Sequence, residues 1–339
     1  MTAKAQIEAR LSRPSREEQL KRALFRGAGL HAGNPQYLAA VATLLDECLL
    51  SDIGAGDLTV KALGLAKGRA RARVVAKEAG IAAGIEEFQW LLRLGGISVT
   101  PLKKDGDRME CDEALLEIEG QCGDLLSHER TGLNVLQRMS GIATMTHRLQ
   151  ERVRRHNPHT CVVATRKTPW GLLDKRAVHL GGGGTHRLGL GDAILVKNNH
   201  LTLLAPREEE AVGLAIERAW AFRQAAAFIE IEVRSAESAV AAAQAFRQLR
   251  EDDSSFHARP QLRASCPCLL LLDNMSLEQV RGTVDALEPE QLREDVLLEV
   301  SGKITESNLD KYAACGADAL SMGALTHSPR ALDFNLRIL

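Results

Sequence analysis

The second half of the chain contains six short apolar runs, and each of them ends in polar or charged residues. The runs lie at residues 161–164, 193–196, 228–233, 268–272, 296–300 and 319–320. Short apolar runs with β-branched residues, separated by helical stretches, are typical of parallel strands that are covered on both faces. Because the carboxyl ends of parallel strands meet at one edge of a sheet, one site should receive all the polar clusters. The pattern therefore predicts an α/β enzyme whose pocket holds several cations and several carboxylates.

The first half of the chain shows a different pattern. Residues 1–35 contain a polar helix and a linker rich in Gly, Asn and Pro, and we expect this extension to pack loosely on the body. Segments 71–77 and 115–119 read as strands of a smaller sheet around a helix at 86–94. A long helical stretch at 125–154, with a predicted interruption where serine and glycine adjoin, leads into the six runs.

Length and composition limit the class of protein. The chain has 339 residues, more than the roughly 250–300 over which one core usually grows, so two domains are expected. A formal net charge of −1 argues against a protein that binds nucleic acid through overall positive charge. Seven widely spaced cysteines, an odd number, fit a reducing, cytoplasmic compartment. The charged N-terminus and the lengths of the apolar runs predict neither a signal peptide nor a membrane partner.

Cationic side chains follow the first two apolar runs. Arg166 and Lys167 come after the first run, and Lys197 comes directly after the second. Each of them alone is compatible with a solvated surface charge, which is the commonest state of Lys and Arg. Three cations at one edge of a sheet repel one another, and this repulsion needs anions to offset it. The implied ligand is strongly acidic.

A run of four glycines, residues 181–184, stands shortly before His186 and Arg187. Glycine lets backbone amides approach an anion closely, and the cations that follow would complete a site for carboxylate or phosphate. A flexible loop without a ligand is the alternative interpretation.

Carboxylates follow or lie within the third and fourth runs. Glu232 and Asp273 offer hard oxygen ligands suited to Mg²⁺, which is commonly held through a few carboxylates and substrate phosphates. Glu230 has the same parity as Glu232, so both side chains share one face of the strand. Alternatively, these carboxylates pair with the neighbouring cations in a buried network, since buried charges are usually paired.

Segments that contain small residues follow the last two runs. The first is Ser301, Gly302 and Lys303, and the second is 321–324 with His327. Loops after the final strands of a β/α barrel frequently bind phosphate through backbone amides at a short helix. An ordinary strand-to-helix turn suits small residues equally well. If the first interpretation holds, one pocket contains two anion sites and a metal, which fits a phosphorylated sugar beside an acidic acceptor.

Several segments of the chain together resemble the quinolinate phosphoribosyltransferase family in content and in order. They are His-Glu-Arg-Thr-Gly-Leu-Asn at 128–134, Ser-Gly-Ile-Ala-Thr at 140–144, Thr-Arg-Lys-Thr at 165–168, the glycine run ending in His-Arg, and Gly-Ala-Leu-Thr-His-Ser at 323–328. The resemblance covers residues 37–339. It implies a type II phosphoribosyltransferase fold, with an N-terminal α/β sandwich domain and an incomplete seven-stranded α/β barrel. The implied parts are a helical extension at 1–36, the sandwich domain at 37–127 joined by 329–339, and the barrel domain at 128–328.

The resemblance also implies an activity, a cofactor and an assembly. The protein would transfer phosphoribosyl from phosphoribosyl pyrophosphate to quinolinate with decarboxylation, in NAD biosynthesis, with Mg²⁺ as cofactor. It would be a homodimer or a higher even oligomer with a shared active site. The implied quinolinate pocket consists of Arg166, Lys167, His186, Arg187 and Lys197, with Arg130 of the partner subunit. Glu232 and Asp273 would face ribose and Mg²⁺, and the remaining substrate-binding residues would be Ser301, Gly302, Lys303, Gly323 and His327. The implied catalytic residues are Lys167, Lys197, Glu232 and Asp273.

The chain departs from the family pattern beside several of these residues. The departures are Ala164, Thr185, Asn198, Lys303 and the shortened segment 169–175, which gains a tryptophan. Most of them adjoin residues that match the family pattern, so they bear on the shape of the acceptor pocket and not on the class of reaction. A paralogous phosphoribosyltransferase with another aromatic acid as acceptor is therefore the first alternative. A β/α-barrel aldolase with a Schiff base on Lys197 and a non-catalytic anion-binding protein are alternatives from other classes.

Overall fold

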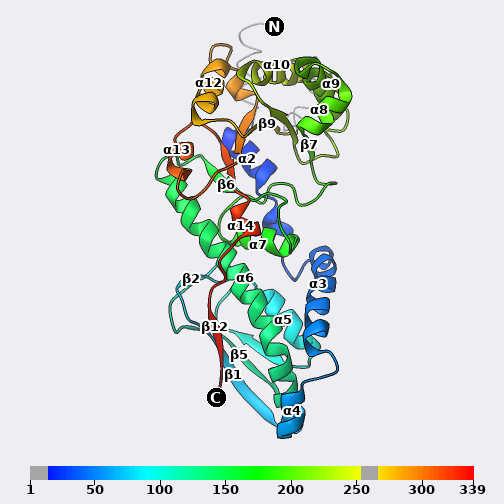
Figure 1. Cartoon of the computed structure of the whole chain (residues 1–339), viewed down its shortest axis with the longest axis vertical. Coiled ribbons are helices and arrows are strands. Elements are labelled where there is room, and N and C mark those ends of the chain that lie inside the picture. The colour runs from blue at the N-terminus through cyan, green and yellow to red at the C-terminus, as the bar shows by residue number, and fades with distance from the viewer. Residues whose placement is uncertain (1–13, 253–265) are drawn as a thin grey trace. The chain divides into compact units, whose positions relative to one another are not determined.

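The computed structural model describes residues 14–252 and 266–339, which fold into two compact units (Figure 1). The unit that we call the parallel unit contains, within the described ranges, residues 14–26, 151–166 and 186–322. The antiparallel unit contains residues 27–150, 167–185 and 323–339. Each is named after the direction of the strands in its main sheet.

Six parallel strands form the sheet of the parallel unit, in the order β6-β11-β10-β9-β8-β7. They are β6 (Cys161–Val163), β7 (Ile194–Val196), β8 (Ile229–Val233), β9 (Cys268–Asp273), β10 (Leu297–Ser301) and β11 (Ala319–Ser321). One strand falls in each of the six apolar runs, so the predicted α/β architecture is confirmed. The central strands are almost entirely buried, as expected when helices cover both faces of a parallel sheet.

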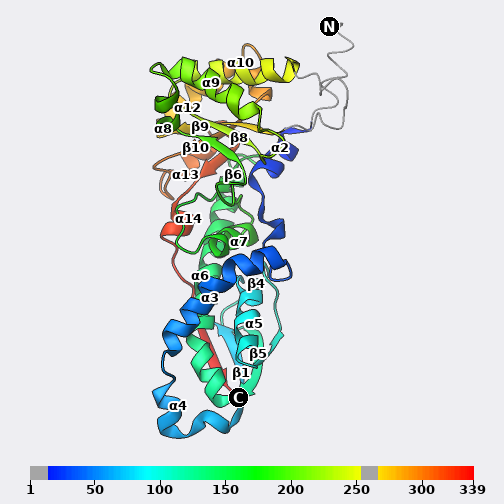
Figure 2. The same cartoon turned by 90° about the vertical axis from the view of Figure 1, so that its right-hand side faces the viewer.

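Amphipathic helices cover this sheet. They are α8 (Asn198–Leu204), α9 (Glu208–Trp220), α10 (Ala236–Asp252), α12 (Leu277–Leu287) and α13 (Leu309–Ala313). Helices α9 and α10 pack against each other and against β8, and Figure 2 shows them as a layer over the strands. Helix α10 buries Ala239, Ala242, Ala243 and Phe246, the spacing that places side chains on one face of a helix.

The sheet contains six described strands, where the resemblance implies seven. Between β6 and β7 the chain carries the glycine run, which forms no strand; its single bridge residue, Gly184, belongs to the antiparallel unit. Glycine weakens a strand because it has no side chain to pack and because ordering its backbone costs more entropy. The sheet stays open, with β6 and β7 at its edges, which agrees with an incomplete barrel.

Helix α2 (Arg16–Leu24) closes the amino end of the parallel strands. A capping box between Ser15 and Glu18 starts the helix. Leu20 and Leu24 are buried in one cluster with residues at or just before the starts of all six strands, among them Phe228. The expectation of a loosely packed extension is therefore wrong for residues 14–26; residues 1–13 lie outside the described ranges. The polar composition hid three apolar positions spaced for one helix face, at 20, 23 and 24.

An antiparallel sheet in the order β12-β1-β5-β3 is the main sheet of the second unit. Its strands are β1 (Arg69–Ala76), β3 (Ser98–Pro101), β5 (Ala114–Gln121) and β12 (Phe334–Ile338), and β2 (Gly80–Ile81) pairs separately with β4 (Arg108–Met109). The helices are α3 (Pro35–Ile53), α4 (Leu58–Leu63), α5 (Ile85–Leu94), α6 (Cys122–Arg154), α7 (Leu172–Leu180) and α14 (Ala324–His327). The smaller sheet and its helix were predicted from the sequence. The resemblance implied only that residues 329–339 join this domain, and the structure shows that β12 does so by pairing with β1.

The long helix α6 runs without interruption through Ser140 and Gly141, so the predicted break there is wrong. A Cβ at Gly141 would lie 2.1 Å from the carbonyl oxygen of Arg330. Glycine is therefore required for the close approach of the chain near 330, and the helix tolerates it because packing outweighs its low helix propensity. None of the helices in the described ranges is long and apolar enough to cross a membrane.

A buried ion network joins α3, α5 and α7 in the antiparallel unit. The guanidinium of Arg176 lies 3.0 Å from Glu87, 3.0 Å from Glu86 and 2.7 Å from Asp105. The hydroxyl of Tyr37 donates a hydrogen bond of 2.7 Å to Glu87. Burial raises the pKa of Glu87 to about 7, with Arg176 opposing the shift and Asp105 adding to it. This network stabilises the unit only while each charge keeps its partner.

Candidate active site

The parallel sheet gathers the predicted polar residues at its carboxyl edge. Arg166 follows β6, Lys197 follows β7 directly, Glu232 lies near the end of β8, and Asp273 and Ser301 are the last residues of β9 and β10. Asp273 is in register with Ser301, and Glu232 is in register with a residue of β9. Because all these strands run in the same direction, the carboxyl ends meet as the sequence predicted.

Two guanidinium groups of this unit, those of Arg166 and Arg187, interact electrostatically. Arg187 is buried, and burial together with the positive charge of Arg166 lowers the pKa of its guanidinium. One nitrogen of Arg187 donates a long hydrogen bond of 3.4 Å to the carbonyl of Ala193. Within the described residues, Nε of Arg187 is buried and meets no hydrogen-bond acceptor. A bound carboxylate would satisfy this nitrogen and offset the repulsion between the two cations.

His186 is buried beside Arg187 and directs both ring nitrogens into the protein. The backbone N–H of Arg187 donates to Nδ1 at 2.7 Å. Nε2 lies 3.0 Å from Glu230 and 3.4 Å from Glu299, both of them buried glutamates. Since Nδ1 accepts a hydrogen bond, the ring proton is on Nε2, which donates to Glu230. The three donor atoms lie within 4.8 Å of one another, but a protonated Nε2 is not a metal ligand.

Glu232 and Asp273 form the acidic part of the site. Burial and the negative charge of Asp273 raise the pKa of Glu232, while the backbone N–H of Asn198 and the charge of Lys197 oppose this shift. Two carboxylates that repel each other bind a divalent cation favourably, since the cation removes the repulsion. The donor set therefore fits Mg²⁺, which prefers carboxylate oxygens together with those of a phosphate-bearing substrate.

A tight turn follows β10 at Gly302 and Lys303. Both residues have positive φ, +89° and +54° respectively. A Cβ at Gly302 would lie 2.4 Å from the side-chain oxygen of Asn274, and the backbone N–H of Asn274 donates to the carbonyl of Ser301 at 2.9 Å. Only glycine fits this position without displacing the turn after β9. The turn is therefore more constrained than an ordinary strand-to-helix connection.

The remaining predicted site residues belong to the antiparallel unit. Lys167, Gly323 and His327 lie together there, since a Cβ at Gly323 would be 2.9 Å from the His327 ring and 3.3 Å from the Lys167 side chain. The hydroxyl of Thr326 donates to the carbonyl of Lys167 at 2.8 Å, which ties the two segments together. Arg130 is an exposed residue on α6.

The glycine run serves close packing within the antiparallel unit. Gly181, Gly183 and Gly184 are buried, and a Cβ at Gly181 would lie 2.4 Å from the carbonyl oxygen of Ala143 on α6. The buried ammonium of Lys175 donates to the carbonyl of Thr185 directly after the run. These contacts do not support an exposed anion-binding loop. The group suited to an anion is the guanidinium of Arg187, which follows the run.

Two parts of the arrangement were missed by the sequence interpretation. Glu299, which interrupts the fifth apolar run, contacts His186, and Arg138 on α6 pairs with the buried Asp174. A charge inside an otherwise buried strand is a usable signal, because such residues are rarely buried without a partner. Nothing in the spacing of Arg138 marks it, since its partner is 36 residues away.

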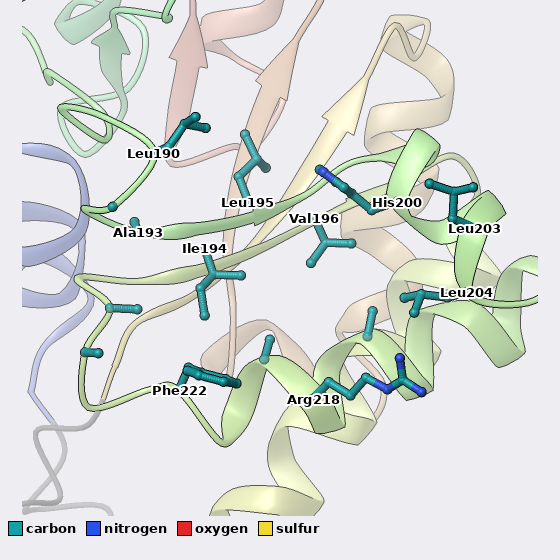
Figure 3. Close-up of a pocket in the computed structure, with 15 residues that line it drawn as sticks. Leu190, Ala193, Ile194, Leu195, Val196, His200, Leu203, Leu204, Arg218 and Phe222 are labelled. Atoms are coloured by element: carbon teal, nitrogen blue, oxygen red, sulfur yellow. The ribbon is translucent and has the colours of Figure 1, made fainter.

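An apolar pocket of about 670 Å³ lies beside the edge strand β7 and contains none of the predicted site residues (Figure 3). Ile194 and Val196 of β7 line it together with Leu204 of α8, and Arg218 of α9 lies at its border. The pocket has little polar surface for an acidic ligand. The chemistry therefore belongs to the carboxyl edge of the sheet and not to this pocket.

The fold and the site define an α/β protein of the enzyme class that gathers cations and carboxylates at the carboxyl edge of a parallel sheet. The chain belongs to the quinolinate phosphoribosyltransferase family. The model of the quinolinate phosphoribosyl transferase C-terminal domain matches residues 142–337, and the model of the N-terminal domain matches residues 57–140.

The chain is similar to proteins that are named nicotinate-nucleotide pyrophosphorylase (carboxylating). The chain is 36% identical over 297 residues to a probable nicotinate-nucleotide pyrophosphorylase (carboxylating) of Methanothermobacter thermautotrophicus, covering 87% of this chain and 98% of the relative. It is 36% identical over 287 residues to the nicotinate-nucleotide pyrophosphorylase (carboxylating) of Mycobacterium leprae, covering 83% and 90%. The crystal structure of NadC from Streptococcus pyogenes superposes with a TM-score of 0.73 at 32% identity, over 89% of this chain and 98% of that one.

Proposed function

We propose that this chain catalyses phosphoribosyl transfer from phosphoribosyl pyrophosphate to quinolinate, with loss of CO₂, to give nicotinate mononucleotide and pyrophosphate in NAD biosynthesis. Family membership over both domains supports the reaction class. The single observation that supports the acceptor is the buried Arg187, whose Nε meets no hydrogen-bond acceptor within the described residues and whose pKa is lowered by the charge of Arg166. A pyridine dicarboxylate supplies the two anionic groups that such a pair requires.

The acceptor pocket in this proposal is made by cations of the parallel unit. Arg166, Arg187 and Lys197 hold the carboxylates, and His186 supports Arg187 from inside the protein. Lys167 serves the same anionic region. Arg130 of the partner subunit completes the pocket, so the active enzyme is a homodimer or a higher even oligomer.

The sugar side of the site would use the acidic residues and the constrained turns. Glu232 and Asp273 would hold Mg²⁺ and face the ribose, and Mg²⁺ would neutralise charge on the departing pyrophosphate. The 5'-phosphate would meet the segments after the last two strands, at Ser301, Gly302, Lys303, Gly323 and His327. Positive φ at Gly302 and Lys303 and the packing of Gly323 on His327 support two preformed turns.

The chain's own residues then act by positioning and electrostatics. The cations orient the acceptor so that its ring nitrogen attacks C1 of the ribose, where positive charge develops as pyrophosphate leaves. The negative charges of Glu232 and Asp273 stabilise that positive charge. Once the nitrogen is quaternised, its positive charge stabilises the carbanion left on the adjacent ring carbon as the carboxylate departs as CO₂, and this carbon then takes a proton from water. No protein nucleophile is needed, and Lys167 and Lys197 contribute as fixed cations.

A second acceptor class is favoured by one observation. Trp170, in the shortened segment after Thr168, lies under the guanidinium of Arg138 at 5.2 Å. An added aromatic group in a segment that follows Arg166 and Lys167 changes the local shape, so another aromatic acid could replace quinolinate. The aldolase alternative has no comparable support, because Lys197 is exposed and a Schiff-base lysine depends on a desolvated or strongly cationic environment.

Domain limits and compartment remain part of the proposal. We place the sandwich domain at 37–127 with 329–339, supported by the pairing of β12 with β1. The barrel domain at 128–328 would follow an extension at 1–36. Within the described residues none of the seven cysteines forms a disulfide, which supports a reducing, cytoplasmic compartment.

The direct test is to identify the product. Purified protein is incubated with quinolinate, phosphoribosyl pyrophosphate and Mg²⁺, and the nucleotide is identified by mass spectrometry, with ¹³C label in the 2-carboxylate to follow CO₂. Nicotinate and other pyridine or benzoic acids serve as competing acceptors. Formation of nicotinate mononucleotide with labelled CO₂ supports the proposal, whereas turnover only with a different acid assigns the chain to a paralogous phosphoribosyltransferase.

A further inference from the structure

We propose that Arg234 is a further substrate-binding residue, which binds the pyrophosphate group of phosphoribosyl pyrophosphate beside the two carboxylates of the sugar side. This assignment rests on the proposed function, because it adds one contact to a substrate of the same site. Arg234 is the first residue after β8 and belongs to the parallel unit. The sequence interpretation did not assign it to the site.

The strand register places Arg234 at the carboxyl edge of the sheet. Val233, directly before Arg234, is in register with Leu272, which directly precedes Asp273. Asp273 is in register with Ser301, the last residue of β10. Because the three neighbouring strands run in the same direction, Arg234 follows β8 at the level where β9 and β10 end. These two strand ends are the ones that the proposed function assigns to Mg²⁺ and to phosphate.

The connection that carries Arg234 is short and well anchored. Helix α10 begins at Ala236, so only residues 234 and 235 join strand and helix. The hydroxyl of Ser235 accepts a hydrogen bond of 3.1 Å from the backbone N–H of Ser238, which fixes the connection to the first turn of the helix. Arg234 also has the same parity as Glu232, which in an extended segment directs both side chains to one face. Arg234 is therefore held near the acidic pair.

The guanidinium of Arg234 is exposed and acts electrostatically on the acidic pair. Its positive charge opposes the rise in the pKa of Glu232 that burial and Asp273 cause. Within the described residues, no hydrogen bond or ion pair occupies this guanidinium. Its N–H donors therefore remain available to an anionic ligand that binds beside Glu232 and Asp273.

The departure of pyrophosphate gives this cation a chemical role. As the bond between C1 and oxygen breaks, its electron pair passes to the oxygen of the leaving pyrophosphate, where negative charge increases. Glu232 and Asp273 are both acidic and repel this charge, and Mg²⁺ offsets the repulsion only in part. A guanidinium binds phosphate oxygens bidentately and stabilises the charge. Since the proposed function assigns Arg166 and Lys197 to the acceptor, Arg234 supplies a separate cation for the leaving group.

The first experiment compares the kinetics of Arg234→Ala and Arg234→Lys. We expect Arg234→Ala to raise the KM for phosphoribosyl pyrophosphate by about tenfold or more, since the variant loses hydrogen bonds between charged groups. The KM for quinolinate should change by less than about twofold. Arg234→Lys should recover part of the loss, because lysine keeps the charge but not the bidentate geometry. Equal increases in both KM values for Arg234→Ala would overturn the assignment.

Arg281→Ala is the matched control. Arg281 is also an exposed arginine of the parallel unit, but it lies within helix α12 and not at a strand end. Its removal changes the net charge by the same amount, so it separates a local effect from a general electrostatic one. Both KM values should stay at the wild-type level in this variant. A loss equal to that of Arg234→Ala would show that net charge, and not the position of Arg234, sets the affinity.

The second experiment measures binding without turnover. Calorimetric titration of the full-length protein with pyrophosphate, in the presence of Mg²⁺, gives the dissociation constant of the leaving group. We expect Arg234→Ala to weaken this binding by about tenfold or more and to leave the affinity for quinolinate unchanged. The urea midpoint of unfolding should equal that of the wild type, because an exposed side chain without an ion pair contributes little to stability. A lowered midpoint together with weaker binding of both ligands would indicate a structural role instead.

The binding data also separate this assignment from the proposed function. If the wild type binds pyrophosphate and Arg234→Ala binds it equally tightly, the role of Arg234 alone is overturned. If the wild type forms no nucleotide from quinolinate but binds pyrophosphate, the proposed acceptor is wrong, while the comparison of the two proteins still decides the role of Arg234. A wild type that binds no pyrophosphate with Mg²⁺ would contradict both.

Discussion

The buried carboxylate of Asp174 accepts two parallel hydrogen bonds from Arg138, each 2.8 Å long, from Nε and from Nη2. The hydroxyl of Thr168 donates to the same carboxylate, and Arg138 also donates to the carbonyl of Thr326 at 2.9 Å. Thr168 and Thr326 adjoin Lys167 and His327 in sequence. The pair thus joins two segments that carry predicted site residues, and this bidentate geometry is specific to arginine.

Removing Arg138 should destabilise the protein strongly. Arg138→Ala leaves the fully buried Asp174 carboxylate without its cation, which typically costs about 3–5 kcal/mol. The free energy of unfolding is measured by urea denaturation. Arg154→Ala is the control, because its exposed pair with Glu151 should contribute about 0–1 kcal/mol. Equal losses in the two variants would contradict the role of the buried pair.

The antiparallel unit should lose stability as the pH rises from about 4.5 to about 7. Burial raises the pKa of Glu87 from its ordinary 4.5 to about 7, so in this window the folded state binds the proton and the unfolded state does not. Stability then falls with increasing pH, the reverse of the usual carboxylate behaviour.

Glu87→Gln should flatten this part of the stability profile. The free energy of unfolding is measured by urea titration at several pH values, with Glu86→Gln as control. Glu86 contacts the same guanidinium at 3.0 Å but is 39% exposed. The Glu86 variant should keep the wild-type slope. An unchanged slope in Glu87→Gln would show that other groups set the pH dependence.

Two inactive variants should restore activity when their subunits exchange. If Arg130 of the partner subunit completes each site, then Arg130→Ala and Arg166→Ala each disable every site in a homodimer. A mixed dimer contains one site with both arginines intact, so a one-to-one mixture should recover about a quarter of wild-type activity. The rate of nucleotide formation is measured after exchange, and each variant incubated alone is the control. A mixture as inactive as its components would contradict the shared site.

Changing Asp273 should affect the metal side of the site more than the acceptor side. Asp273→Asn removes one of the two neighbouring negative charges and weakens the attraction for Mg²⁺. We expect the Mg²⁺ concentration for half-maximal rate to rise by about tenfold or more, with little change in quinolinate affinity measured by calorimetry. Asp285→Asn, a substitution on α12 away from the strand ends, is the control. Equal effects on metal and acceptor would refute the assignment.

Local pattern was sufficient for the strands of the parallel unit. The runs that begin near Cys161 and Phe228 are apolar, short and rich in branched residues, and such segments form buried strands in most tertiary contexts. The position of Arg166, Lys197 and Asp273 at one edge then followed from the common strand direction. Conversely, Gly141 predicted a break in the helix that does not occur. The glycine is needed there because the chain near 330 packs directly against the helix, a contact that the local sequence does not reveal.

By itself the sequence determined the strand-and-helix order, the chemistry at each strand end and, through its motifs, the family. These features depend on residue type and local spacing, which the sequence contains directly. The tertiary structure alone decided that His186 turns inward to Glu230, that Leu24 closes the base of the strands, and that Arg138 meets Asp174. Such pairings depend on which surfaces exclude water together, and residues far apart in the chain carry no local sign of the partner that folding will give them.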